Sequence, residues 1–212
     1  MTMTAIETTA AISEQDALRA DIFALLASLL RRAPDAALLD WLATLEPEEE
    51  DNPMSRAWSA LALSASHSQP PQIGDEYQQL FIGIGRGELM PFGCWYLTGS
   101  LMEKPLATLR QDLASLGYER QPDIKEPEDH IAAQCEVMSM MISSGFSARQ
   151  QMQFWKRHLS PWALRFFRDL QNADNALFYS TVALLGTAFY EQEENHYLRL
   201  APTAPAESTL QF

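Results

Sequence analysis

The chain has 212 residues, of which 47% are hydrophobic and 20% charged, and its formal net charge is -13 at pH 7. This balance predicts a globular domain with a buried core and excludes a largely disordered chain. Phosphate binding needs clustered Lys and Arg, so the negative charge excludes nucleic acid and an anionic membrane surface as expected partners. A basic peptide or a basic protein surface is the partner that this charge favours.

The two cysteines, Cys94 and Cys135, lie far apart in apolar surroundings, which predicts two reduced, buried thiols. No CxxC pair is present, and the sequence indicates no metal or cofactor of its own. The order of residues at the N-terminus is not that of a signal peptide, and the longest apolar stretch, 24–30, is too short to span a bilayer. We therefore expect a cytoplasmic protein without stable membrane insertion.

Helical periodicity dominates the first third of the chain. Ser13 is placed to cap a first helix, which Pro34 ends. Further helices are expected at 35–45, 54–66 and 74–81, with an acidic loop at 47–53. The first helix should bury one apolar face, made of Leu18, Ile22, Leu25, Leu26, Leu29 and Leu30.

The segment 83–99 differs in character, because it holds five of the nine glycines together with Phe92, Trp95 and Tyr96. It predicts a long irregular loop, and long loops in compact domains are often functional. The aromatic side chains could form a protein-binding pocket or fill the core beneath the loop. The spacing of the glycines does not match a phosphate-binding loop.

Helices resume at 101–116, at 127–143, on both sides of Pro161, and at 174–197. No alternating strand pattern is found, so the predicted fold is all-α, a single domain of about eight helices. We expect the helical domain to span 13–200 in two parts, with a hinge near 117–126. Residues 1–12 and 201–212 are expected to be flexible.

The sequence Glu126-Pro127-Glu128-Asp129-His130 reads first as a good helix start, with proline and acidic residues in the first turn. If the helix begins at Pro127, Glu126 and His130 share one of its faces and could bind a peptide through hydrogen bonds. No second histidine follows at metal-binding spacing, so a metal site has no support.

Five motifs, in order, resemble those of the TorD/DmsD family of redox-enzyme maturation chaperones, in its DmsD-like branch. They are Tyr77-x-x-Leu80-Phe81-x-Gly83, Pro91-Phe92-Gly93-Cys94-Trp95-Tyr96, Glu126-Pro127-Glu128-Asp129-His130, His158-Leu159-x-Pro161-Trp162-x-x-Arg165-Phe166 and Phe178-Tyr179. The resemblance extends over roughly residues 15–198.

The resemblance implies a chaperone that is not an enzyme. Such chaperones bind the twin-arginine (Tat) signal peptide of a molybdenum enzyme and hold the apoprotein until its cofactor is inserted, before export. The client would be of the dimethyl sulfoxide reductase, trimethylamine N-oxide reductase or formate dehydrogenase type. The peptide-binding residues carried over by the resemblance are Trp95, Tyr96, Glu126, Asp129 and His130, followed by Pro161, Trp162 and Arg165.

The hypothesis for binding is that Asp129 and Glu126 meet the arginines of the signal, while Trp95, Tyr96 and neighbouring methionines meet its apolar stretch. One alternative is a nucleotide-binding or cofactor-handling enzyme that uses the glycine-rich loop and His130. Another is a structural subunit held permanently in a larger complex. The protein is expected to be a monomer, with a swapped dimer as the other possibility.

Overall fold

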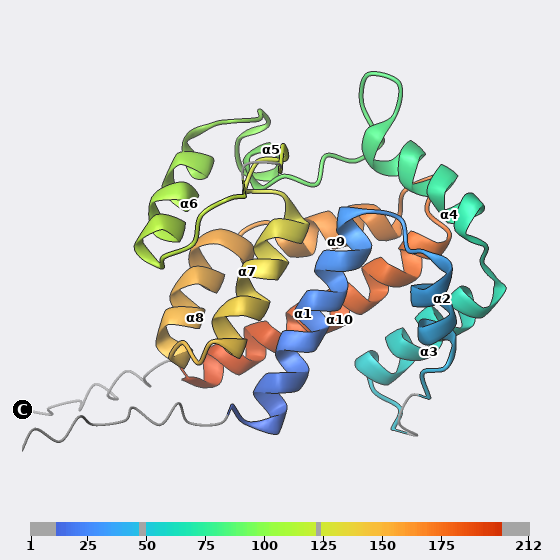
Figure 1. Cartoon of the computed structure of the whole chain (residues 1–212), viewed down its shortest axis with the longest axis horizontal. Helices are drawn as coiled ribbons and strands as arrows, with labels where there is room; N and C mark the ends of the chain where they lie inside the picture. The colour runs from blue at the N-terminus through green and yellow to red at the C-terminus, as the bar shows by residue number, and fades with distance from the viewer. Residues whose placement is uncertain (1–11, 47–49, 122–123, 201–212) are drawn as a thin grey trace, which may run out of the picture.

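Helices form the whole fold in the part of the chain that the computed structural model describes, residues 12–46, 50–121 and 124–200 (Figure 1). No β-strand occurs among these residues apart from a single bridge between Phe92 and His130. The all-α prediction is therefore confirmed. In chain order the helices are α1 (Glu14–Arg31), α2 (Ala36–Ala43), α3 (Pro53–His67), α4 (Pro70–Tyr77), the π-helix η1 (Gln78–Ile82), α5 (Gly93–Thr98), α6 (Lys104–Ser115), α7 (Ile131–Ser143), α8 (Ala148–Phe154), the π-helix η2 (Trp155–Leu159), α9 (Ala163–Gln171) and α10 (Phe178–Leu200).

Polar side chains begin several helices by binding backbone N–H groups that have no partner within the helix. Ser13 accepts a hydrogen bond from the Asp16 amide, as expected, and Asp35 and Asn52 cap α2 and α3 in the same way. Ser147 and Gln150 form a reciprocal capping box at α8. These starts are therefore local properties of the sequence.

The core forms around two long helices that cross near the middle of the molecule, α1 and α10 (Figure 1). α1 packs mainly on α7, and α10 packs on α3 and α9. Buried aromatic rings join these layers: Phe23 on α1 lies edge-on to Phe189 and Tyr190 on α10, and Tyr190 lies against Trp155. Both cysteines are free and buried, which confirms their prediction.

Three features that the sequence predicted differ in the structure: the start of α4, the absence of a helix at 83–99 and the start of α7. α4 begins at Pro70 rather than near residue 74, because proline is compatible with the first turn of a helix. The segment predicted as an irregular loop at 83–99 contains the short helix α5. The helix expected from Pro127 begins at Ile131, and the residues before it form a turn in which the His130 amide binds the Pro127 carbonyl.

The predicted apolar face of α1 is only partly buried. Ile22, Leu26, Leu29 and Leu30 lie in the core, whereas Leu18 is 60% exposed. By contrast, the apolar residues spaced at helical intervals along α10 are all buried: Phe178, Val182, Leu185 and Phe189. The exposure of Leu18 is a departure from periodicity that the sequence does not explain.

Most of the predicted flexible ends, 1–12 and 201–212, and part of the predicted hinge at 117–126 lie outside the described residues. Gly117 takes a positive φ of 81° just after α6, in the left-handed conformation with which many helices end. Within the described ranges, no helix has both the length and the apolar character that crossing a membrane requires.

Candidate functional site

Two of the motifs meet through their backbones, although they lie more than thirty residues apart in sequence. The Ile131 amide donates to the Pro91 carbonyl at 2.9 Å, and the Gly93 amide donates to the Asp129 carbonyl at 2.9 Å. The loop before α5 is thus held against the turn before α7. This junction supports the idea that the two motifs form one site.

Asp129 caps α5 from outside that helix. Phe92 occupies the N-cap position of α5, and its side chain has no atom that can accept a hydrogen bond from the amides of the helix. The Asp129 carboxylate, 3% exposed, accepts instead from the Cys94 amide at 2.8 Å. A negative charge at a helix N-terminus is favourable, so Asp129 holds α5, and with it Trp95 and Tyr96, in place.

His130 lies inside the protein as the N-cap of α7. Its Nδ1 accepts from the Ala132 amide at 3.1 Å, and its ring packs edge-on against Phe92. Burial, together with the nearby positive charge of Arg31, lowers the pKa of His130 to about 4. The imidazole is therefore neutral at pH 7 and acts as a hydrogen-bond acceptor within the fold.

The expectation that Glu126 and His130 share a helix face is wrong, because the helix begins after both of them. Glu126 is exposed, and no ion pair involves it within the described residues. Glu128 is held instead, because Arg110 approaches it at 2.9 Å and Arg120 at 3.5 Å. Of the three acidic residues in this motif, Glu126 is the only one that is exposed.

Aromatic side chains connect α5 to α9. Tyr96 is half-buried, its ring lies 5.5 Å from that of the buried Trp162, and its hydroxyl donates to Asp169 at 2.9 Å. Burial and the Asp169 carboxylate raise the pKa of Tyr96. The exposed Arg165 donates to the Tyr96 carbonyl at 2.7 Å. These contacts hold Tyr96 in one position at the site.

Trp95 points to a different surface of α5. Its ring is half-buried, and the guanidinium carbon of Arg86 lies 5.1 Å from its centroid. Such a cation–π contact is worth about 0.5–1 kcal/mol at an exposed position. The glycine-rich loop therefore contributes an arginine to the site rather than a phosphate cradle.

A cavity of about 440 Å³ opens between α5, α6, α7 and the η2–α9 corner. Trp162 lies in its wall, where its Nε1 donates to the His158 carbonyl at 2.6 Å, and the exposed Pro161 lies at its edge. A Cβ on Gly93 would lie 3.2 Å from Trp162 Nε1, so glycine permits this close packing. The remaining lining residues are Leu97, Thr98, Lys104, Pro105, Thr108, Leu109, Gln134, Arg157 and His158.

The end of α5 and the segment that joins it to α6 expose apolar side chains next to residues that line the cavity. Leu97, Leu101 and Met102 are all exposed there, and Met102 has a φ of 60°, which is uncommon for a residue other than glycine. Strained backbone of this kind persists only where its surroundings enforce it and occurs often at ligand-binding segments. These side chains form an exposed apolar edge beside the cavity.

The structure divides the eight predicted site residues by their accessibility. Glu126, Pro161 and Arg165 are exposed and Trp95 and Tyr96 half-buried, so all five can contact a ligand; Asp129, His130 and Trp162 are buried and support them. Of the methionines near the motif, Met138 and Met141 are fully buried in the core and Met140 is exposed.

Sequence reasoning missed most of the cavity wall. Gln134 is 2% exposed, donates to the Asp129 carbonyl at 3.3 Å, and stands out in sequence only as a polar residue on an apolar helix face. His158 also lines the cavity, with its Nε2 2.7 Å from Asp112. Burial lowers the pKa of His158, an effect that the Asp112 carboxylate opposes.

His130 is buried and hydrogen-bonded within the fold, and the described residues contain no group of three His, Cys, Asp or Glu side chains that could hold a metal ion. The exposed part of the site is an apolar surface with charged residues at its edges, which is suited to binding a polypeptide.

The sequence matches the profile of a known protein family over more than half of its length. A profile of the nitrate reductase delta subunit family matches residues 47–168, which include both motifs of the junction. The chain belongs to this family, which also holds the TorD and DmsD chaperones.

Two relatives illustrate the family membership. Chaperone protein TorD of Vibrio cholerae is 24% identical over 135 residues, 58% of this chain and 61% of that protein. A Haemophilus influenzae protein assigned as a Tat proofreading chaperone DmsD is 32% identical over 119 residues, 53% of this chain and 56% of that protein. The matched part thus spans about 60% of the length of these family members.

The fold of the family is also seen in a solved structure. A protein from Archaeoglobus fulgidus assigned as a redox enzyme maturation protein superimposes with a TM-score of 0.53 and 18% identity, covering 84% of this chain and 94% of that one. At this identity the similarity establishes the fold alone.

Proposed function

We propose that this protein is a cytoplasmic chaperone that binds the twin-arginine signal peptide of a molybdenum-containing oxidoreductase. In this role it holds the apoprotein during cofactor insertion and delays export until insertion is complete. It has no catalytic activity of its own. The client is of the dimethyl sulfoxide reductase, trimethylamine N-oxide reductase or formate dehydrogenase type.

The observation that carries the proposal is the junction of the two motifs beside an apolar cavity. Asp129 accepts a hydrogen bond from the α5 N-terminus at 2.8 Å, and α5 in turn places Leu97 in the cavity wall and the half-buried Trp95 on a neighbouring surface. The chain is 24% identical to a protein named TorD and 32% identical to one assigned as DmsD, which supports a chaperone role.

The chemistry of the surface fits a signal that is basic at one end and apolar in the middle. The apolar stretch would lie along Leu97, Leu101 and Met102 with a side chain in the cavity, where each well-buried apolar side chain contributes about 1.5–3 kcal/mol before entropy losses. Glu126, exposed at the site, would meet an arginine. This replaces Asp129 as the expected arginine partner, because Asp129 is buried and already bonded.

Calorimetric titration with synthetic twin-arginine signal peptides of the three client types tests the proposal. The cognate peptide should bind with micromolar or tighter affinity, and its arginine-to-alanine version should bind about tenfold more weakly, since one charge-assisted contact is worth about 1.5–3 kcal/mol. No binding to any twin-arginine peptide, or equal binding of both versions, would refute signal-peptide recognition.

Single-residue variants test whether the signal peptide binds at the motif site. Trp95→Ala and Glu126→Gln should each weaken binding of the signal peptide about 5- to 20-fold. The exposed Glu126 should contribute little to the free energy of unfolding, and Trp95→Ala should lower it by about 1 kcal/mol through loss of the Arg86 contact, which leaves the protein folded. The matched control is Leu63→Gln, an exposed apolar residue on α3, which should leave the affinity unchanged. If Trp95→Ala and Glu126→Gln bind like the control, the peptide does not use this surface.

A further inference from the structure

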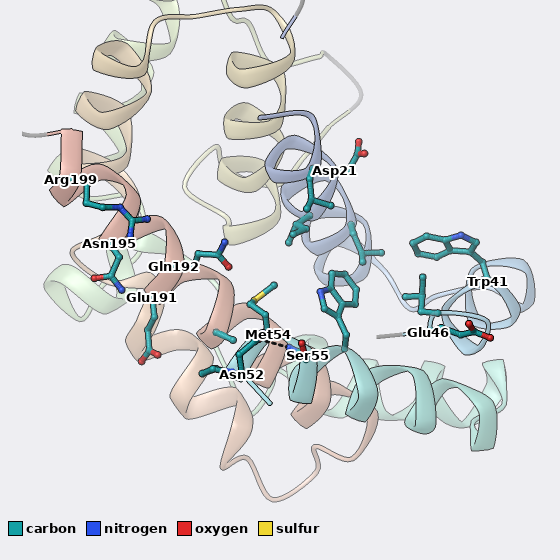
Figure 2. A pocket seen from close by; sticks show the side chains of 17 residues that line it. Asp21, Trp41, Glu46, Asn52, Met54, Ser55, Glu191, Gln192, Asn195 and Arg199 are labelled. Atoms are coloured by element: carbon teal, nitrogen blue, oxygen red, sulfur yellow. Dashed lines mark hydrogen bonds between the residues drawn. The ribbon is translucent and has the colours of Figure 1, made fainter. Parts of the chain in front are cut away.

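A second and larger cavity, of about 810 Å³, lies away from the motif site. It opens between α1, α10, the end of α2 and the start of α3 (Figure 2). None of the eight predicted site residues lines it. We call this cavity the α1–α10 groove and define it by Leu18, Asp21, Trp41, Trp58 and Glu191.

The walls of the α1–α10 groove are apolar and in part openly exposed. Leu18, Ile22 and Leu25 follow one another at spacings of four and three, so a stripe along α1 faces the groove. Leu18 is 60% exposed and Trp41 is 49% exposed. The remaining apolar lining residues are Leu45, Met54, Trp58 and Ala188. Clustered exposure of large apolar side chains marks interaction surfaces.

The charged residues of the groove are mostly negative. Asp21, Glu46 and Glu191 line it, and none of them forms an ion pair within the described part of the chain. Arg199 is the one cation in the lining (Figure 2). An occupant with positive side chains would be attracted by these carboxylates and could also place a cation over a tryptophan ring.

We propose that the α1–α10 groove docks an amphipathic, basic helix of a partner protein. Its apolar face would cover the α1 stripe and the two tryptophans, and its Lys or Arg side chains would meet Asp21, Glu46 and Glu191. The proposal concerns a different surface from the motif site and does not rest on signal-peptide binding there.

Helical conformation of the occupant follows from the apolar walls. An extended segment would place unpaired backbone N–H and C=O groups against leucine and tryptophan side chains, at a cost of about 1–3 kcal/mol for each unsatisfied group. A helix satisfies these groups internally and presents only side chains. A second copy of this chain is a poor occupant, because each copy carries a net charge of -13.

The test uses a synthetic peptide of about 18 residues, or five helical turns, with leucines on one face and lysines beside them. Calorimetry compares it with a version in which every lysine is glutamate and with a scrambled version of the same composition. The basic amphipathic peptide should bind with a dissociation constant near 10 μM or tighter, and both controls should bind at least tenfold more weakly.

Variants of the full chain assign that binding to the groove. Leu18→Gln combined with Trp41→Ala should weaken the basic peptide at least tenfold, and Asp21→Asn combined with Glu191→Gln should weaken it and reduce its salt dependence. Leu63→Gln and Trp95→Ala should leave it unchanged. Leu18, Trp41 and Leu63 are all exposed, so circular dichroism should report an intact fold in each of these variants.

Four results would overturn the proposal. The first two are equal binding of the charge-reversed peptide and unchanged affinity in the groove variants. The third is a concentration-dependent dimer that Trp41→Ala abolishes, which would make a second copy the occupant. The fourth is loss of twin-arginine peptide binding in the groove variants but not in Trp95→Ala, which would move the signal-peptide site to this groove. Failure of twin-arginine binding alone leaves the groove proposal standing.

Discussion

At the scale of single residues, the acidic motif before α7 separates into groups that contact solvent and groups that hold the fold. Glu126 is exposed, while Asp129 and His130 are buried and bonded to backbone amides. Neighbouring residues of this motif therefore have different structural roles. A substitution at Asp129 should therefore change the position of α5, whereas under the proposed function one at Glu126 should change the contact with the peptide.

His130 makes stability depend on pH. Its pKa is lowered from 6.5 to about 4 in the folded protein, so between these values the unfolded chain binds more protons and acid favours unfolding. This contribution is fully present above pH 6.5 and is lost as the pH falls toward 4, by roughly 3 kcal/mol.

The variant His130→Asn tests this contribution, because asparagine retains an N-cap acceptor but does not titrate. Urea unfolding at pH 7.0, 5.5 and 4.5 should show a smaller acid loss in the variant. His158 and His196, whose pKa values are also lowered, remain in both proteins, so their effects cancel. Identical pH slopes for the two proteins would contradict the assignment.

At the scale of helices, the close approach of α9 and α10 depends on Gly186. A Cβ at this position would lie 2.2 Å from Cε1 of Phe167, a ring that is fully buried and cannot move aside. Gly186→Ala should therefore destabilise the protein by about 1–3 kcal/mol or more, as overpacked cores do.

Gly74 is the matched control, because it lies within α4 and a Cβ there meets nothing within 4 Å. Gly74→Ala should stabilise the protein by about 0.5–1 kcal/mol, since alanine restricts the unfolded chain and favours a helix. Thermal unfolding of the two variants should shift in opposite directions, and a loss at Gly74 equal to that at Gly186 would contradict the packing argument.

α1 and α10 are also joined by a buried ion pair. Arg19 donates to Glu193 through Nε at 2.7 Å and through Nη2 at 2.8 Å, and the Tyr197 hydroxyl lies 2.8 Å from the same Nη2. Both charged side chains are at most 5% exposed. Removing Arg19 leaves the Glu193 carboxylate buried without its charged partner, and removing Glu193 leaves Arg19 with Asp16, at 2.7 Å, as its remaining ion-pair partner.

Arg19→Met and Glu193→Leu should each cost about 3–5 kcal/mol, whereas the double variant should cost less than either single change, because an apolar pair replaces both charges. Urea unfolding of the three variants in a double-mutant cycle measures this coupling. Additive losses would show that the pair does not act as a unit.

At the scale of the whole molecule, the two candidate surfaces lie over different helices. The motif site belongs to α5, α6, α7 and α9, and the α1–α10 groove lies toward α2 and α3 (Figure 1). The net charge of -13 creates a negative electrostatic potential around the molecule, which should increase the association rate of basic partners at both surfaces.

This field predicts a salt dependence for the signal peptide. Raising NaCl from about 0.05 to 0.5 M should lower the association rate about tenfold and change the dissociation rate less, because screening acts at long range. Stopped-flow fluorescence measures both rates, and the arginine-to-alanine peptide is the control that should respond weakly. A rate independent of salt would exclude electrostatic steering.

The sequence by itself determined the fold class, the caps at Ser13 and Gly117, the buried thiols and the family motifs. These follow from local periodicity, capping chemistry and residue order, which need no knowledge of distant contacts. Only the tertiary structure decided that α5 is helical, because its cap, Asp129, lies 35 residues further along the chain. The tertiary structure also decided which residues of the family motifs are exposed, because burial depends on which helix packs against each residue. Leu18 is exposed for the same reason, since it faces the open α1–α10 groove and not another helix.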